Sequence, residues 1–268
     1  MISPQPAAPN PQPLLDVDSI GISFGGLKAV EGFSIRLPRG SLYGLIGPNG
    51  AGKTTVFNLL TGVYPTMSGR MTLASRSLVG LKPHDVTAAG IARTFQNIRL
   101  FPGLNVLDNV QLAGQLRARE GLAATLLRTR RYAHEEAEIR RKAFDLLGLF
   151  GLQDRAAEPA DSLSYGRQRH LEIVRALAAE PKVLLLDEPA AGLNSQEKIE
   201  LAKSIRHIRD RFDVAILLIE HDMGLVMDIC EQITVLDHGV IIAHGSPQDV
   251  QNDPKVIAAY LGADVGTI

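Results

Sequence analysis

The stretch GPNGAGKTT at residues 47–55 constrains the fold of this chain more than any other part of the sequence. It fits the pattern G-x-x-x-x-G-K-[ST], and it stands between an apolar run, SLYGLIG (41–47), and a helical pattern, KTTVFNLLTG (53–62). A strand, a glycine-rich loop and a helix in this order place backbone N–H groups and the positive end of the helix around phosphate oxygens. The sequence therefore predicts a phosphate loop in an α/β fold, rather than a glycine-rich turn without a ligand.

The residue types of this loop each have a chemical reason to be there. Glycines let the backbone curl around phosphate oxygens. Lys53 would reach the β- and γ-phosphates, and the Thr54 hydroxyl would bind Mg²⁺. The residues expected to hold the nucleotide here are Gly47, Pro48, Asn49, Gly50, Ala51, Gly52, Lys53, Thr54 and Thr55.

Two further apolar runs deliver polar residues to what would be the same edge of a sheet. LLLDEP (184–189) places Asp187 and Glu188 at the end of a buried strand, where open α/β sheets bind ligands. Asp187 suits Mg²⁺, directly or through water, and Glu188 suits a base that orients an attacking water. VAILLIEHD (214–222) ends beside His221. The alternatives are an ordinary turn and a structural histidine, and the phosphate loop favours the functional interpretation.

The wider pattern predicts an α/β core with two attached parts. Continuous apolar runs at 182–187 and 214–220, separated by a helical pattern, indicate a parallel sheet covered on both faces. Alternating apolar residues over 17–37 predict short strands near the N-terminus. Residues 105–158 have helical spacing instead, and 233–245 suggests a hairpin.

Composition excludes several classes of protein. With 45% hydrophobic residues the chain can bury a core, and 28 basic against 29 acidic residues argue against a nucleic-acid binder. The single cysteine, Cys230, excludes an intrachain disulfide and a cysteine-based metal cluster, and predicts a small core residue. The opening MISPQPAAPNPQPLL lacks the basic and apolar regions of a signal peptide, so we expect a flexible tail. The apolar runs are too short to cross a bilayer, so we expect a soluble chain whose work at a membrane is done through partners.

The ordered set of motifs resembles the nucleotide-binding subunit of an ATP-binding cassette (ABC) transporter. The resemblance extends from about residue 15 to 262. Its motifs are the phosphate loop, RTFQN (93–97), LSYGR (163–167), LLLDEP (184–189), AAGLN (190–194) and IEHD (219–222).

The resemblance implies a fold and a division of the chain. The fold would be α/β, a P-loop NTPase with a RecA-like core, an N-terminal antiparallel β subdomain and a helical subdomain at about 105–178. A disordered Pro-rich tail (1–13) would precede the ABC ATPase domain (14–262), and a C-terminal tail (263–268) would follow it.

The resemblance also implies roles for single residues. Glu188, His221 and Gln96 would be catalytic in ATP hydrolysis, and Asp187 would belong to the ATP-binding set. The Mg²⁺ ligands would be Thr54, Gln96 and Asp187. Phe24 is similar to the aromatic residue that stacks on adenine in the family, and its alternative is a core position in a strand.

The motif LSYGR (163–167) resembles the signature turn of the family. Ser164 can cap the helix that follows, while Tyr165 and Gly166 present N–H groups at the positive end of that helix. In the family this turn, here with Arg167, binds the ATP held by the facing subunit, so that two chains enclose two ATP molecules. An ordinary N-capped surface helix is the alternative.

Within the family, several phrases are similar to the ATPase of the branched-chain amino acid importer. They are TFQNIRLFPGLNVLDNV, LSYGRQRHLEI, DEPAAGLN, IEHDMGLVM and the closing AAYLG, and urea, amide and lipopolysaccharide transport ATPases share several of them. This resemblance implies two transmembrane permease subunits, a second ABC ATPase subunit (a paralogue or a second copy) and, indirectly, a periplasmic or extracellular solute-binding protein. The chain would lie at the cytoplasmic face of the inner membrane. Ile98, Leu100 and Phe101 would line the groove for a membrane-subunit helix, or simply pack between lobes.

Two positions depart from the family pattern, and three rival interpretations stand beside the transporter. Arg167 replaces the usual Gln and Asn194 the usual Asp, although neither change removes a residue required for hydrolysis. An ABC ATPase without transport would carry tandem cassettes or long coiled-coil insertions, which the sequence lacks. A GTPase would need an Asn-Lys-x-Asp motif, a kinase would not need LSYGR, and a pure binding module would not need both Glu188 and His221.

Overall fold

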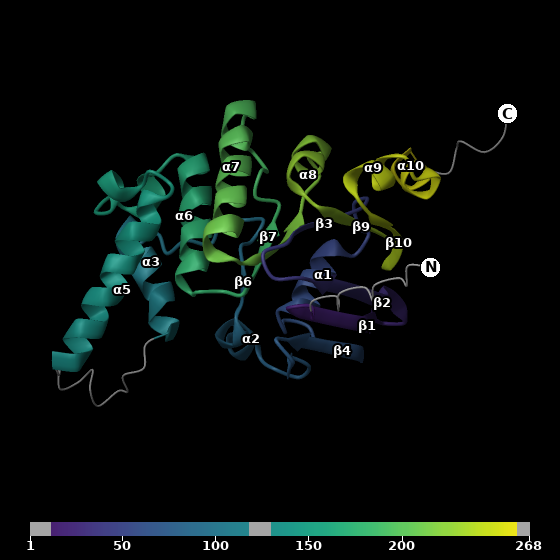
Figure 1. Cartoon of the computed structure of the whole chain (residues 1–268), viewed down its shortest axis with the longest axis horizontal. Helices are drawn as coiled ribbons and strands as arrows, with labels where there is room; N and C mark the ends of the chain where they lie inside the picture. The colour runs from purple at the N-terminus through teal and green to yellow at the C-terminus, as the bar shows by residue number, and fades with distance from the viewer. Residues whose placement is uncertain (1–11, 118–129, 262–268) are drawn as a thin grey trace, which may run out of the picture.

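The computed structural model describes residues 12–117 and 130–261, which form two sheets and a group of helices (Figure 1). The tails expected at 1–13 and 263–268 therefore lie outside the described residues, apart from positions 12 and 13. Within the described part of the chain, one sheet has six strands and the other has four.

The larger sheet is the mostly parallel core that the apolar runs predict. Its order is β10-β9-β3-β8-β7-β6, and every neighbouring pair except β10 and β9 is parallel. The strands are β3 (Leu42–Ile46), β6 (Ile91–Arg93), β7 (Val183–Asp187), β8 (Ala215–Ile219), β9 (Gln232–Asp237) and β10 (Val240–Gly245). β9 and β10 form the predicted hairpin, in which Asp237 pairs with Val240. Because β3 lies between β8 and β9, the loop after β3 opens in the middle of the carboxyl edge of the sheet.

Alternate residues of the central strands pack into two separate cores. Leu184 and Leu186 of β7 belong to a cluster with residues of α7 and α8, whereas Val183 and Leu185 belong to a cluster with α1 and the second sheet. The helices beside the sheet are α1 (Lys53–Leu60), α7 (Ser195–Phe212), α8 (Met223–Ile229), α9 (Pro247–Gln251) and α10 (Pro254–Leu261). The strand is therefore buried on both faces, as its unbroken apolar sequence predicts.

The second sheet is antiparallel and is built largely from the N-terminal part of the chain. β1 (Leu15–Phe24) lies between β2 (Leu27–Leu37) and β4 (Ser68–Leu73), and β5 (Arg76–Ser77) extends the edge. The strands expected near the N-terminus are thus confirmed, and they are longer than the pattern suggests. The sequence patterns do not predict β4, β5, β6 or α2 (Pro83–Ala89).

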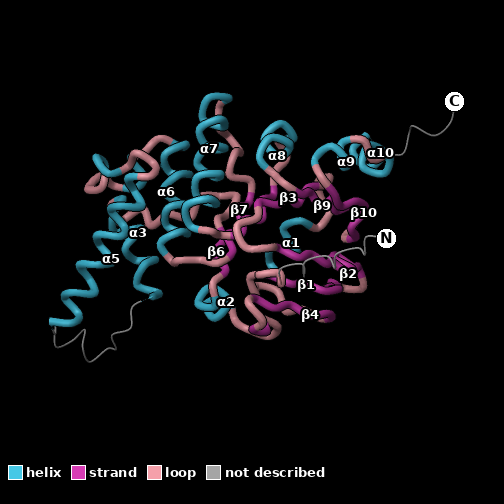
Figure 2. Tube along the Cα trace, viewed as in Figure 1, coloured by secondary structure: helices cyan, strands magenta, loops and turns pink. Residues whose placement is uncertain are grey.

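Helices gather at one end of the molecule, away from the strands (Figure 2). Val110 of α3, Leu147 of α5 and Val174 of α6 meet in a third buried cluster. The helices of this part are α3 (Val106–Gly114), α5 (Arg130–Gly148) and α6 (Tyr165–Ala178), with 3-10 turns at Gln115–Arg117, Gln153–Arg155 and Ala160–Ser162. The helical character expected for residues 105–158 is confirmed over the described residues.

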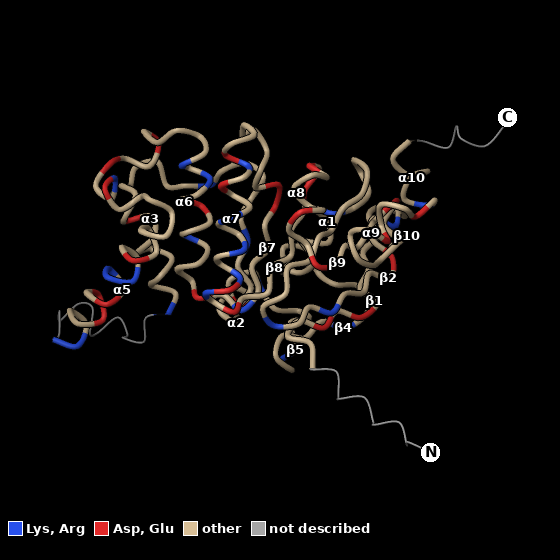
Figure 3. The backbone as a smooth tube through the Cα atoms, turned by 45° about the horizontal axis from the view of Figure 1, so that its top comes forward, with Lys and Arg blue, Asp and Glu red and all other residues tan. Residues whose placement is uncertain are grey.

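Acidic and basic residues are interspersed along α5 (Figure 3), and its buried residues are Ala143 and Leu147. Most of α5 is therefore in contact with solvent where it is described. No helix within residues 12–117 and 130–261 combines the length and the apolar character needed to span a bilayer.

Candidate nucleotide-hydrolysis site

The phosphate loop joins β3 to α1, and two of its glycines are required by their surroundings. Gly47 has a φ of 150°, and a Cβ there would lie 1.9 Å from the Leu236 carbonyl oxygen. Gly52 has a φ of 102°, and its Cβ would lie 2.7 Å from the Ala29 carbonyl oxygen. A side chain at either position would be strained and would clash, so the loop can approach the neighbouring strands only with glycine.

Lys53 begins α1, and its ammonium group folds back onto its own loop. Its Nζ donates to the carbonyl oxygens of Gly47 (2.6 Å) and Pro48 (2.8 Å), and the residue is 6% exposed. Burial lowers the pKa of Lys53, while the carboxylates of Glu188 and Asp187 oppose this shift. The lysine is therefore held by weak acceptors that an incoming phosphate, with its full negative charges, would replace.

Asp187 ends β7 and forms a buried ion pair that the sequence patterns do not predict. Nη2 of Arg93, at the end of β6, lies 2.7 Å from Oδ2 of Asp187, and both side chains are almost fully buried. Nη1 of the same guanidinium donates to the Asn58 side chain of α1 (2.7 Å). The Cζ atom of Arg93 lies 5.4 Å from the ring centroid of Phe57 and 5.1 Å from that of Phe95. The carboxylate is thus anchored through one oxygen.

Glu188 is the point where three loops of the carboxyl edge meet. Its Oε2 accepts a hydrogen bond from Gln96 Nε2 (2.8 Å), and its Oε1 lies 2.7 Å from His221 Nε2. Its N–H donates to the Ile219 carbonyl at the end of β8 (2.9 Å). Glu188 therefore contacts both Gln96 and His221, the other two residues proposed as catalytic, and each of the three residues follows a different strand.

Glu220 supports this meeting point, although the sequence gives it no role. The side chain is buried, and its Oε1 accepts from the Ala190 N–H (2.6 Å) and its Oε2 from the His221 N–H (3.2 Å). Burial raises the pKa of Glu220, and these backbone donors oppose the shift. Glu220 thus ties the turn after β7 to the turn after β8.

The signature turn (residues 163–167) stands at the start of α6, and one detail of its prediction is wrong. Ser164 occupies the N-cap position, but its side chain makes no capping hydrogen bond, and both Ser164 and Arg167 are exposed. A Cβ at Gly192 would lie 3.0 Å from the Tyr165 ring, so that ring packs on the turn before α7. A Cβ at Gly166 would lie 2.8 Å from the Glu197 carboxylate. Ser164 is therefore exposed and does not cap its own helix.

The remaining residues singled out in the sequence lie on the surface. Phe24 is 46% exposed and meets the Tyr64 ring edge-on, with 5.2 Å between ring centroids, so its alternative as a core residue is wrong. Phe101 is 47% exposed, and Ile98 and Leu100 are half-buried. An aromatic edge and an apolar patch are thus open to contacts from outside.

The signature turn and the phosphate loop of one chain lie apart. The views in Figures 1 and 3 place α6 and α1 on different sides of β7. The principal packing partners of α6 are α3 and α5. Within one chain, the signature turn and the phosphate loop therefore belong to helices on different sides of β7.

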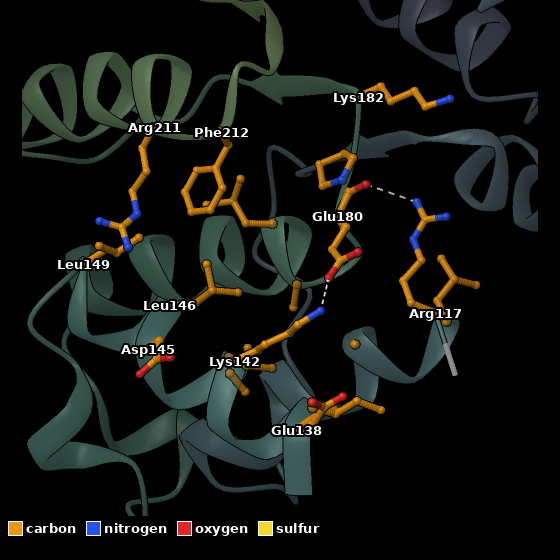
Figure 4. Close-up of a pocket in the computed structure, with 18 of the residues that line it drawn as sticks. Arg117, Glu138, Lys142, Asp145, Leu146, Leu149, Glu180, Lys182, Arg211 and Phe212 are labelled. Carbon is orange, nitrogen blue, oxygen red and sulfur yellow. Dashed lines mark hydrogen bonds and ion pairs between the residues drawn. The ribbon is translucent and has the colours of Figure 1, made fainter. Parts of the chain in front are cut away.

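A pocket of about 1190 Å³ lies elsewhere, between α5 and the C-terminal ends of α6 and α7 (Figure 4). Lys142 crosses it to Glu180 with a 2.7 Å ion pair, and Phe212 and Leu146 contribute apolar walls. Among the described residues, no member of the phosphate loop lines it. This hollow is therefore separate from the candidate site.

A glycine-rich loop follows the central parallel strand β3, and the Asp187 carboxylate is held at the end of β7, two strands away in the same sheet. This arrangement defines a P-loop nucleoside triphosphatase. Residues 30–191 match the ABC transporter family, and residues 240–266 match the branched-chain amino acid ATP-binding cassette transporter family. The chain therefore belongs to the ABC transporter family, as an ATP-hydrolysing subunit, and the predicted fold class is confirmed.

Individual relatives agree with this assignment. The chain is 45% identical to the high-affinity branched-chain amino acid transport ATP-binding protein LivG of Salmonella typhimurium, over 94% of this chain and 98% of LivG. It is 41% identical to BraF of Pseudomonas aeruginosa over the same shares of the two chains. The solved structure of the ADP conformation of MJ1267, an ATP-binding cassette of an ABC transporter, has a TM-score of 0.81 at 30% identity, covering 94% of this chain and 99% of that one.

Proposed function

We propose that this chain powers the uptake of branched-chain amino acids by hydrolysing ATP beneath membrane permease subunits. The observation that carries the hydrolytic part is the Glu188 carboxylate, held between Gln96 and His221 at the carboxyl edge of the sheet. The observations that favour this substrate class are the family match of residues 240–266 and the identity to LivG.

The geometry supports a direct hydrolytic mechanism. ATP would place its phosphates in the phosphate loop, and Lys53 would exchange the carbonyls of Gly47 and Pro48 for phosphate oxygens. Glu188 would orient a water and take its proton as the water attacks the γ-phosphorus, while the bond from that phosphorus to the β-phosphate oxygen breaks and ADP leaves. His221, bonded to the same carboxylate, would keep the carboxylate aligned and contact the γ-phosphate.

The oxygen donors near this point fit Mg²⁺. Thr54 offers an exposed hydroxyl, Asp187 a carboxylate anchored through one oxygen, and Gln96 an amide oxygen, which together suit a hard cation that keeps several waters. Bound with ATP, Mg²⁺ supplies neutralisation of the phosphate charges. Phe24, exposed beside Tyr64, would stack on the adenine.

The partner of this chain would be a second ABC ATPase subunit, either a paralogue or another copy. Ser164, Tyr165, Gly166 and Arg167 would bind the ATP held by the phosphate loop of that partner, because α6 and their own α1 lie on different sides of β7. Two permease subunits would dock at the apolar patch around Phe101, at the cytoplasmic face of the inner membrane, and a solute-binding protein would take part indirectly.

Purification and reconstitution test this proposal. The tagged chain, extracted in mild detergent from cells that hold its natural complex, should bring with it two integral membrane proteins. Vesicles of that complex should take up labelled leucine when ATP is inside with the ATPase subunits, and a Glu188→Gln complex should not. Uptake of urea or an amide instead would reassign the substrate, and the absence of any membrane partner would favour an ABC ATPase without transport.

A further inference from the structure

The loop that carries Gln96 changes its attachment between two adjacent residues. Thr94 belongs to the sheet, because its N–H donates to the Leu185 carbonyl (2.9 Å) and its hydroxyl accepts from the Asp187 N–H (3.2 Å). Phe95, the next residue, is bonded to helix α6 instead. The boundary between the sheet and the helical part of the molecule therefore runs through this loop.

A buried ion pair in the second turn of α6 makes the attachment. Arg169 and Glu172 have side chains 0% and 1% exposed, and Nη1 of Arg169 lies 2.9 Å from Oε2 of Glu172. The guanidinium also donates to the carbonyl oxygens of Phe95 (2.7 Å) and Gln96 (2.8 Å). Oε1 of Glu172 accepts from the N–H groups of Phe95 (3.2 Å) and Arg99 (3.3 Å). Four hydrogen bonds thus hold the loop backbone on both sides of Gln96.

The same guanidinium reaches the signature turn. Nη2 of Arg169 donates to the Tyr165 hydroxyl (3.1 Å), and the Tyr165 ring packs on Gly192. Only the planar fork of an arginine can serve two carbonyls, a carboxylate and a hydroxyl in these directions at once. Apolar side chains often stabilise a buried site as well as an ion pair does. Stability alone therefore does not account for an arginine and a glutamate here.

We propose that Arg169 and Glu172 are positioning residues for hydrolysis, which make Gln96 move with α6. Gln96 would then reach Glu188 only when the signature turn has the position that it has in this structure. Binding of the partner's ATP to the signature turn would therefore set the alignment of the Glu188 carboxylate. This inference rests on the proposed role of Glu188. A small movement would be enough, because a shift of the Gln96 side chain by about 1 Å would break its 2.8 Å hydrogen bond to Glu188.

Hydrogen exchange of the full-length chain tests the attachment without requiring activity. In the wild type, the two amides of this loop that donate to Glu172, those of Phe95 and Arg99, should be protected. In the double variant Arg169→Met/Glu172→Leu, apolar groups of similar length replace the pair, and we expect exchange there to be faster by about tenfold or more. Exchange in β7 and β8 should not change. Equal protection of residues 95–99 in the two proteins would overturn the proposal.

Steady-state ATPase kinetics then test whether the pair acts through Gln96. The double variant should lose about tenfold or more in kcat while the KM for ATP stays within about threefold, because the phosphate loop is untouched. Adding Gln96→Ala to the double variant should cost nothing beyond Gln96→Ala alone. Losses that multiply, or a kcat equal to that of the wild type, would show that the pair does not position Gln96.

A second ion pair with the same spacing is the control for a loss of charges. Arg155 and Glu158 lie 3.0 Å apart, with side chains 41% exposed, so Arg155→Met/Glu158→Leu should keep the wild-type kcat. If the first double variant does not fold, Arg169→Lys keeps the charge but loses the fork, and it should still lower kcat and raise exchange at residues 95–99. Unchanged values in that variant would sink the proposal. A wild type without ATPase activity would instead refute the proposed function, and hydrogen exchange would still decide this inference.

Discussion

Among single residues, Glu188 has the most constrained position in the site. Its φ of +49° is a left-handed value that a residue with a side chain adopts only when its surroundings fix it. The fixing contacts are its own N–H to the Ile219 carbonyl and the Ala190 N–H to the Glu220 carboxylate. The direction of the carboxylate is therefore set by the ends of β7 and β8 before any ligand arrives.

Glu188→Gln should abolish turnover while leaving ATP binding almost intact. The amide keeps the shape of the side chain but cannot take a proton from water, so kcat should fall by about a hundredfold or more. The Kd for ATP should stay within about threefold, because no phosphate-loop atom changes. Phosphate release and equilibrium binding measure the two quantities. Lys53→Ala is the opposite control, since it should weaken ATP binding first, and wild-type turnover in Glu188→Gln would contradict the role of Glu188.

Cys230 should be unreactive in the folded protein. Burial raises the pKa of its thiol to about 12, and only the thiolate attacks disulfide reagents. At about pH 8 the lower thiolate fraction alone should slow the reaction with Ellman's reagent by about a thousandfold relative to the unfolded chain. Because folding raises this pKa, the associated stability is complete below the ordinary thiol value and declines as the pH rises towards 12. A rapid reaction without denaturant would show that the thiol is accessible.

Two arginines are among the residues whose contacts the sequence could not reveal. Arg93 and Asp187 are 94 positions apart, and their ion pair depends on β6 lying beside β7. Arg169 stands in a run of charged residues typical of an exposed helix, yet its side chain is fully buried. The short motifs LLLDEP and IEHD pointed to Glu188 and His221, and the family resemblance of RTFQN pointed to Gln96, whereas a pairing across the fold leaves no such pattern.

At the level of secondary-structure elements, Asn194 is the N-cap residue of α7. The side chain of Asn194 accepts from the Glu197 N–H (3.0 Å), and the Glu197 carboxylate accepts from the Asn194 N–H (2.9 Å). This reciprocal pair is a capping box. The departure from the usual Asp thus preserves an acceptor at the N-cap, where Asn and Asp serve about equally well.

Asn194→Ala should destabilise the chain by about 1 kcal/mol, because the Glu197 N–H at the start of α7 loses its side-chain acceptor. That loss corresponds to a fall of about 2–4 °C in Tm for a chain of this size. Asn194→Asp is the control and should stay within a few tenths of a kcal/mol of the wild type. Thermal unfolding of the nucleotide-free chain measures both, and equal Tm values for the alanine variant and the wild type would refute the cap.

Elements with a strong period were predictable, and short ones were not. Val183–Leu186 of β7 and Ala215–Ile219 of β8 are apolar at every position, because alternate residues enter two different cores. β6 has three residues and β5 has two, so neither contains a period to detect. β6 nevertheless brings Arg93 to the site and leads into Gln96, and its position was set by pairing with β7.

At the scale of the whole molecule, the phosphate loop and the signature turn lie in different parts of the fold. Lys53 is on α1 and Ser164 precedes α6, and these helices lie on different sides of β7 (Figure 1). We therefore expect the phosphate loop of one chain to meet the signature turn of another chain across the same ATP. Hydrolysis by the isolated chain should then depend on pairs, and under dilute conditions a tenfold dilution should lower the rate per chain by about tenfold. A rate per chain that stays constant on dilution would contradict this.

Mixing two inactive variants gives a sharper form of the same prediction. Lys53→Ala removes the phosphate-loop contact, and Ser164→Arg blocks the exposed signature turn without disturbing a core. In a mixed pair, one site contains both changes and the other contains neither. If the isolated chain pairs with itself at random, half of the pairs are mixed, so about a quarter of the wild-type activity should return on mixing. No recovery, in a preparation where light scattering detects wild-type pairs, would show that each chain completes its own site and would refute the shared arrangement.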